Sequence, residues 1–112
     1  FHSYSQKEVV EKILEVLKQQ NRPLICTEWL NRPQGSTIES ILPIFFSENI
    51  GCLHWGLVNG KTQTHLPWGH RPGDMPYNGI WQHDLYSNDF KMYSPYELQL
   101  FKSYISRSVN NK

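Results

Sequence analysis

The order of helical and strand-like segments most constrains the fold of this chain. Residues 5–20 carry apolar side chains at helical spacing, and residues 24–27 form a short apolar run of strand length. A second helix is predicted from residue 36 to about residue 48, a second strand at 50–55 and a final helix from residue 94. Strands that alternate with helices are typical of a parallel α/β sheet. The sequence of 112 residues therefore predicts one small α/β domain.

Capping boxes mark the start of each predicted helix. The pairs are Ser5 with Glu8, Ser36 with Glu39, and Ser94 with Glu97. Pro95 stands at the first position of the last helix, where proline is favoured. Pro43 falls inside the second helix and predicts a kink or a late start.

Composition and charge exclude several classes of partner. The formal charge of +1 gives no electrostatic case for nucleic acid or an anionic membrane. No apolar run reaches the length of a membrane span. The chain begins at Phe1 and not at Met, so we expect a processed product or a fragment, and its start indicates no compartment.

A carboxylate, Glu28, directly follows the first predicted strand, and Trp29 comes next. An acid at the end of an apolar strand costs stability unless it is paired, and α/β folds place their chemistry at this edge of the sheet. The residue alone leaves two interpretations open: a structural ion pair, for example with Arg32, and a catalytic role. Trp29 and Trp55 favour a sugar ligand, because indole faces stack on the C–H surface of sugars.

His2 and Tyr4 alternate with Ser3 just before the first helix, so a strand ending there would point both side chains the same way. A tyrosine hydroxyl can hydrogen-bond a carboxylate nucleophile and keep it ionised. The alternative is that they are terminal residues without a role.

A long connection, about residues 59–93, separates the second strand from the last helix. It is rich in aromatic residues, so we expect an ordered active-site loop. Trp68 and Trp81 are interpreted either as sugar platforms or as plugs, with plugging favoured for Trp81. The loop histidines lack metal-ligand spacing and are expected to be solvated or hydrogen-bonded.

Seven segments together resemble a known family. They are FHSY at 1–4, RPLICTEW at 22–29, GST at 35–37, LP at 42–43, WGLVNGKTQT at 55–64, PW at 67–68 and WQHD at 81–84. In order and spacing they resemble the carboxyl-terminal part of cellulase-like (β/α)8-barrel glycoside hydrolases, of the clan that includes families 2 and 5. The resemblance covers nearly the whole chain.

This resemblance implies the carboxyl-terminal portion of a (β/α)8 TIM barrel, from the end of the sixth strand to the eighth helix, with residues 1–112 as a partial catalytic domain. It implies a retaining β-glycoside hydrolase that cleaves O-glycosidic bonds in a plant-type or related polysaccharide or oligosaccharide. Glu28 would be the nucleophile, His2 and Tyr4 would line the catalytic subsite, and Trp55 would form its floor. Trp29 and Trp68 are further candidate substrate-binding residues. No metal or cofactor is expected, and a secreted or periplasmic location is implied.

The resemblance also predicts an incomplete site. Retaining glycosidases need a second carboxyl group as acid/base, and in this family that residue lies at the end of the fourth strand. Glu39 and Glu48 lie on a predicted helix, and nothing places Asp74, Asp84 or Asp89 opposite Glu28. The chain alone is therefore expected to be inactive, with a carbohydrate as ligand and the missing amino-terminal part of the barrel as candidate partner. Two alternatives stay open: a non-catalytic carbohydrate-binding module, and an inactive subunit that completes its barrel with another chain.

Overall fold

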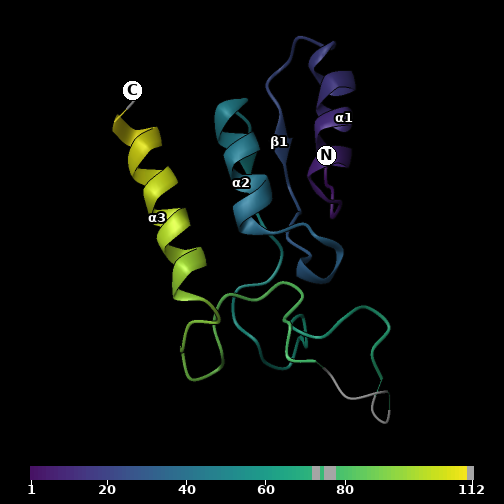
Figure 1. Cartoon of the computed structure of the whole chain (residues 1–112), viewed down its shortest axis with the longest axis vertical. Coiled ribbons are helices and arrows are strands. Elements are labelled where there is room, and N and C mark those ends of the chain that lie inside the picture. Colours follow the sequence, from purple (N-terminus) through teal and green to yellow (C-terminus); the bar gives the residue numbers. More distant parts are fainter. Residues whose placement is uncertain (72–73, 75–77, 111–112) are drawn as a thin grey trace.

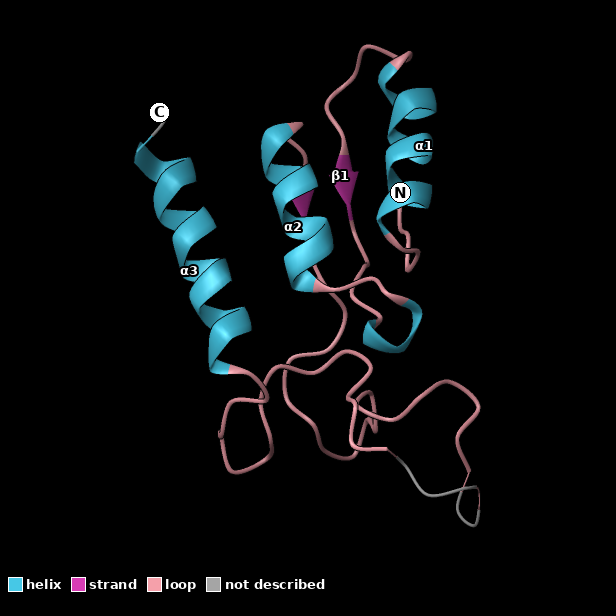
Figure 2. Ribbon diagram, in the orientation of Figure 1, coloured by secondary structure: helices cyan, strands magenta, loops and turns pink. Residues whose placement is uncertain are grey.

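Three helices and a two-stranded parallel sheet make up the regular structure. The computed structural model describes residues 1–71, 74 and 78–110. In chain order the elements are α1 (Lys7–Lys18), β1 (Ile25–Cys26), the 3-10 turn η1 (Arg32–Gln34), α2 (Ile38–Ser47), β2 (Gly51–Cys52) and α3 (Pro95–Asn110). The predicted order of helix, strand, helix, strand, helix is thus confirmed. The helices lie side by side, with β1 between α1 and α2 (Figure 1), and the long connection gathers beyond one end of them (Figure 2).

The prediction of a TIM-barrel portion is wrong. Such a barrel closes eight parallel strands on themselves, each followed by a helix. Within the described residues the sheet has two strands of two residues each, paired in parallel with Ile25 opposite Gly51 and Cys26 opposite Cys52. The backbone leaves the sheet soon after β1, because Leu30 adopts a φ of 78° and turns the chain. The alternative of an inactive subunit that completes its barrel with another chain depends on this fold, so we do not propose it.

Helix starts follow the predictions only in part. Gln6 caps α1 without a side-chain hydrogen bond, so the box of Ser5 and Glu8 is absent. The box of α2 lies one residue later than predicted, with Thr37 and Ser40 bonding each other's backbone N–H. At α3, the Glu97 N–H donates to Ser94 Oγ at 3.3 Å, and Pro95 is the first helical residue as expected. Pro43 lies inside α2, which continues through it.

The core lies between the sheet and the first two helices. Its fully buried members come from α1, β1, the turn after β1 and α2; they include Val10, Cys26, Trp29, Leu30, Ile38 and Ile41. Alternate residues of the sheet point away from the helices, and there Ile25 is 55% exposed and Leu53 63% exposed. One face of the sheet is therefore covered by helices and the other is bare.

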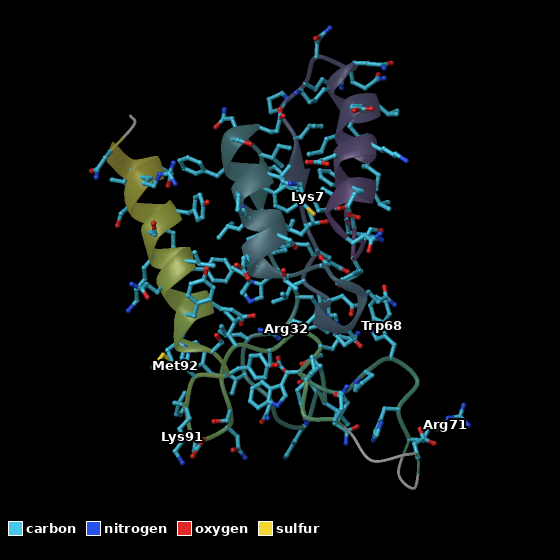
Figure 3. The ribbon with its side chains drawn as sticks, viewed as in Figure 1. Lys7, Arg32, Trp68, Arg71, Lys91 and Met92 are labelled. Atoms are coloured by element: carbon cyan, nitrogen blue, oxygen red, sulfur yellow. The ribbon has the colours of Figure 1, made fainter. Side chains whose placement is uncertain are left out.

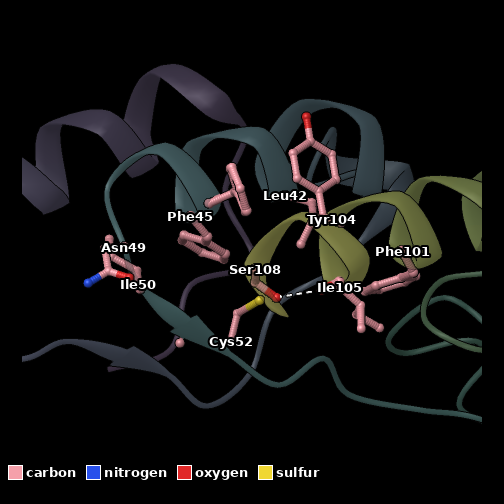
Figure 4. A pocket seen from close by; sticks show the side chains of 11 residues that line it. Leu42, Phe45, Asn49, Ile50, Cys52, Phe101, Tyr104, Ile105 and Ser108 are labelled. Atoms are coloured by element: carbon pink, nitrogen blue, oxygen red, sulfur yellow. Dashed lines mark hydrogen bonds between the residues drawn. The ribbon is translucent and has the colours of Figure 1, made fainter. Parts of the chain in front are cut away.

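Helix α3 lies against α2, but none of its described side chains is buried. Its contacts with α2 are aromatic: Tyr104 lies 5.0 Å from Phe46 between ring centroids, and the Arg107 guanidinium lies 4.6 Å from the Phe46 ring. A cavity of about 590 Å³, lined mainly by apolar side chains, remains between α2, β2 and α3 (Figure 4).

The molecule is elongated, with extents of 48 × 29 × 20 Å. Among the described residues, no helix has the length and apolar character to span a membrane.

The long connection is ordered where the structure describes it. Backbone bonds join its two halves, with the Asn59 N–H donating to Tyr86 O at 2.8 Å and the Gln82 N–H to His65 O at 2.9 Å. Residues 72–73 and 75–77 of the predicted loop lie outside the described residues. The described part of this connection forms one end of the molecule, and the candidate site residues lie at that end.

Candidate functional site

Glu28 and Tyr4 form a direct pair. The Tyr4 hydroxyl donates to Glu28 Oε2 at 2.8 Å, and both side chains are half-buried. The backbone explains the pairing, because residue 2 makes a parallel bridge with residue 28 and the Ser3 N–H donates to Glu28 O at 3.0 Å. Burial, followed by the bond to Glu28 and its negative charge, raises the pKa of Tyr4. The phenol therefore stays protonated and serves as a hydrogen-bond donor to the carboxylate.

Arg32, the candidate ion-pair partner of Glu28, pairs elsewhere. Its Nε and Nη2 donate to the two carboxylate oxygens of Glu97 at 2.9 and 2.7 Å. Its guanidinium also lies 4.3 Å from the Tyr93 ring centre and donates to Trp81 O at 3.0 Å. Arg32 thus ties the turn after β1 to the long connection and to α3 (Figure 3). The structural ion pair at this end of the sheet belongs to Glu97, and Glu28 has Tyr4 instead.

Aromatic rings surround the Tyr4–Glu28 pair. The ring centroid of Tyr4 lies 4.9 Å from Trp68 in an edge-on arrangement, 5.4 Å from His83 and 6.4 Å from His2. Trp68 is 57% exposed, and His2 is also exposed. The long connection therefore brings Trp68 to the strand ends, where the sequence had suggested either a platform or a plug.

A chain of hydrogen bonds holds Trp68 in place. Its backbone N–H donates to Gln82 Oε1 at 2.8 Å, the Gln82 amide nitrogen lies 3.0 Å from His83 Nε2, and His83 Nδ1 lies 2.5 Å from Leu30 O. A carbonyl only accepts, so Nδ1 carries the proton and Nε2 accepts from Gln82. Burial lowers the pKa of His83, which agrees with this neutral form. The bonds run from the turn after β1 to the wall of the site.

Gln82 was not singled out from the sequence, and His83 was expected only to be solvated or hydrogen-bonded. Both are almost fully buried. Their one sequence signal was the unbroken polar run from Gln82 to Asp84 between Trp81 and Leu85. Such a polar run does not by itself predict a buried hydrogen-bond network, because the bonding partners, Trp68 and Leu30, lie elsewhere in the chain.

Trp55 and Trp68 line one cavity of about 260 Å³. Trp55 is 48% exposed, and its N–H donates to Trp29 O at 3.3 Å. The other lining residues are Thr62, Gln63, Thr64, Leu66, Pro67, Gly69, His70 and His83. The cavity therefore joins the predicted floor residue Trp55 to the loop residue Trp68 beside the Tyr4–Glu28 pair.

Two of the predicted tryptophans have structural roles. Trp29 is fully buried, with ring centroids 5.6 Å from Phe45 and 6.3 Å from Phe101, so it offers no surface to a ligand. The turn at Leu30 accounts for this, because it carries the chain inward directly after β1. Trp81 stacks on Tyr93 with ring centroids 5.0 Å apart.

The other candidate carboxylates are engaged away from Glu28. Asp84 is fully buried and accepts from Thr64 Oγ1 at 2.9 Å. Asp89 bonds Ser87 and Lys91, and Asp74 accepts from the Arg71 N–H at 2.5 Å. In the described part of the chain, His, Cys, Asp and Glu form no group of three that could hold a metal ion. The site thus consists of one carboxylate, its tyrosine donor and aromatic walls.

Comparison with known proteins adds no relative. Neither protein-family models, nor curated proteins, nor solved structures gave a significant match to this chain.

Proposed function

We propose that this site acts on a β-glycoside, with Glu28 as the nucleophile of a retaining hydrolysis. The observation that carries the proposal is the 2.8 Å bond from Tyr4 to Glu28 Oε2 beside the exposed face of Trp68. A donor on one carboxylate oxygen orients the group and leaves the other oxygen for attack. An indole beside it suits the apolar face of a sugar ring.

The proposed reaction begins with attack of Glu28 Oε1 on the anomeric carbon. The bond to the leaving-group oxygen breaks, that oxygen takes the electron pair, and a covalent glycosyl ester forms on Glu28. Water then attacks the same carbon, loses a proton to the external acid/base group that acts in the first step, and releases the Glu28 carboxylate. A general acid would protonate the leaving oxygen, and we expect it from outside the described residues. The lone chain should therefore lack proton-transfer assistance worth about 10²–10⁴-fold.

Covalent trapping tests the nucleophile without needing the acid. A 2-deoxy-2-fluoro-β-glycoside with a dinitrophenolate leaving group departs unprotonated, and the fluorine slows breakdown of the ester. With a panel of gluco, manno, galacto and xylo sugars, we expect one adduct, located on Glu28 by peptide mass spectrometry. Tyr4→Phe should slow labelling by between about 10- and 100-fold, because the carboxylate loses its orientation.

Glu28→Gln should give no adduct, whereas Glu39→Gln on α2 should label like the parent chain. An adduct on another carboxylate, or unchanged labelling of Glu28→Gln, would refute the assignment. The absence of any adduct across the panel would count against catalysis by this chain.

Non-catalytic carbohydrate binding is the second candidate. The cavity shared by Trp55 and Trp68 favours it, because both indoles are about half exposed there. It predicts saturable sugar binding that Trp55→Ala reduces and Glu28→Gln leaves unchanged. Trapping at Glu28 would separate the two candidates, since a binding module has no need of a nucleophile.

A further inference from the structure

We propose that the cavity between Trp55 and Trp68 is a subsite for one uncharged pyranose ring and selects against sugars that carry an anionic group. The proposal rests on the carbohydrate function proposed above and names the class of sugar.

The size of the cavity fits a single ring. Its volume of about 260 Å³ falls below the roughly 300–1,000 Å³ of sites for drug-sized ligands. Two indoles from separate segments supply its apolar walls, and Thr62, Gln63 and Thr64 supply hydroxyl and amide groups. The cavity therefore presents apolar and polar surface in similar measure, which matches a sugar, with its apolar ring face and its rim of hydroxyls.

The charges around the cavity disfavour an anion. None of the described lining residues is Lys, Arg, Asp or Glu, and two of them, His70 and His83, are histidines. His83 has both ring nitrogens engaged, with Leu30 O and the Gln82 amide, and is held neutral. A carboxylate or phosphate on the sugar would lose part of its hydration in the cavity, and no cationic side chain there would offset that cost.

A buried carboxylate lies directly behind one wall of the cavity. Thr64 lines the cavity and donates to the buried carboxylate of Asp84 at 2.9 Å. An anionic sugar would therefore meet the Asp84 carboxylate behind this wall, with no Lys or Arg among the described lining residues to offset it.

Matched sugar pairs test this selection. We would titrate methyl β-glucoside against methyl β-glucuronide, and the galactose and mannose pairs likewise, into Glu28→Gln at pH 7.5. Binding would be followed by the indole N–H resonances of Trp55 and Trp68 in a ¹⁵N-labelled chain. We expect a neutral glycoside to shift both resonances, and its uronide to bind roughly tenfold more weakly or worse.

Three variants sharpen the outcome. Trp68→Ala should abolish binding of the neutral glycoside, whereas Tyr96→Ala, at an exposed aromatic outside the cavity, should leave it unchanged. Thr62→Lys places a cation at an exposed rim position and should raise uronide affinity at least threefold. Equal binding of the members of every pair, or no gain with Thr62→Lys, would overturn the selection while leaving sugar binding intact.

Binding of none of the sugars would overturn the subsite. Because Glu28→Gln cannot form the covalent ester, that result is separate from the trapping experiment, which reports on the nucleophile alone.

Discussion

Among the glycines that the structure describes, Gly56 is the one where an added methyl group would meet the closest contacts. It follows Trp55 with a φ of +83°, and a Cβ there would lie 2.7 Å from Asp84 Oδ1 and 2.8 Å from His83 Cβ. Gly56→Ala combines a left-handed backbone, which costs about 1–2 kcal/mol, with a clash against a buried network. We expect a loss of more than about 2 kcal/mol in the free energy of unfolding, measured by urea titration.

Two other glycines provide matched controls. Gly69 has a φ of +78° and nothing within 4 Å of its Cβ position, so Gly69→Ala isolates the backbone cost. Gly60 has neither feature, and Gly60→Ala should change stability by no more than about 0.5 kcal/mol. Equal losses at Gly56 and Gly69 would show that the contact with His83 and Asp84 does not matter.

His83 and His54 make stability depend on pH. Burial lowers the pKa of both below the ordinary 6.5, so below pH 6.5 the unfolded chain binds protons that the folded chain excludes. The free energy of unfolding should therefore be greatest above pH 6.5 and fall as the pH drops toward 5. The slope should reach at most about 1.4 kcal/mol per pH unit for each histidine.

Urea midpoints between pH 5 and 8 measure this slope. His83→Gln should flatten it, and His2→Gln, at an exposed position, should not. A midpoint that stays level or rises toward pH 5 would contradict the prediction.

At the scale of elements, α3 is the least secured. It has no buried side chain among its described residues, whereas α2 buries Ile38, Ile41, Leu42 and Phe45. Amide hydrogens exchange fastest where few apolar contacts are buried. We expect amides of α3 to exchange at least about tenfold faster than those of α2, measured by hydrogen–deuterium exchange with mass spectrometry.

The Arg32–Glu97 pair should protect the first turn of α3. Glu97→Gln weakens a charge-assisted bidentate pair whose side chains are only 5% and 14% exposed. Exchange in the first turn of α3 should then accelerate, while α1 stays unchanged. Protection of α3 equal to that of α2 in the parent chain would be inconsistent with its loose packing.

The elements also show what local pattern can and cannot predict. Apolar spacing found all three helices, because each buries or half-buries one stripe. The barrel prediction failed because the number of strands that pair depends on partners far along the chain. The runs at 24–27 and 50–55 contribute only Ile25–Cys26 and Gly51–Cys52 to the sheet.

The site was predicted unevenly for a similar reason. Tyr4 could be placed beside Glu28 because parallel neighbours carry their end residues to one edge. Trp29 was assigned to the same edge, but the turn at Leu30 sends it into the core. The polar run that contains Gln82 did not predict its role, since that role depends on Trp68 and His83 together.

The whole molecule leaves one face of its sheet bare, and this should make the chain associate with itself. Ile25 and Leu53 lie on that face at 55% and 63% exposure, and in the described residues β2 pairs with β1 alone, so its other edge is open. Apolar patches beside unpaired strand edges promote association. Sedimentation velocity should show oligomers growing between about 10 and 500 μM, at the micromolar-to-millimolar concentrations where such surfaces associate.

Leu53→Lys should shift the chain toward monomer, because a charge on the bare face must be desolvated in the complex. Val16→Lys provides the matched control, since Val16 is 62% exposed on α1 and away from the sheet face. A monomer at every concentration, or an equal effect of both lysines, would show that the bare face is not the surface that associates.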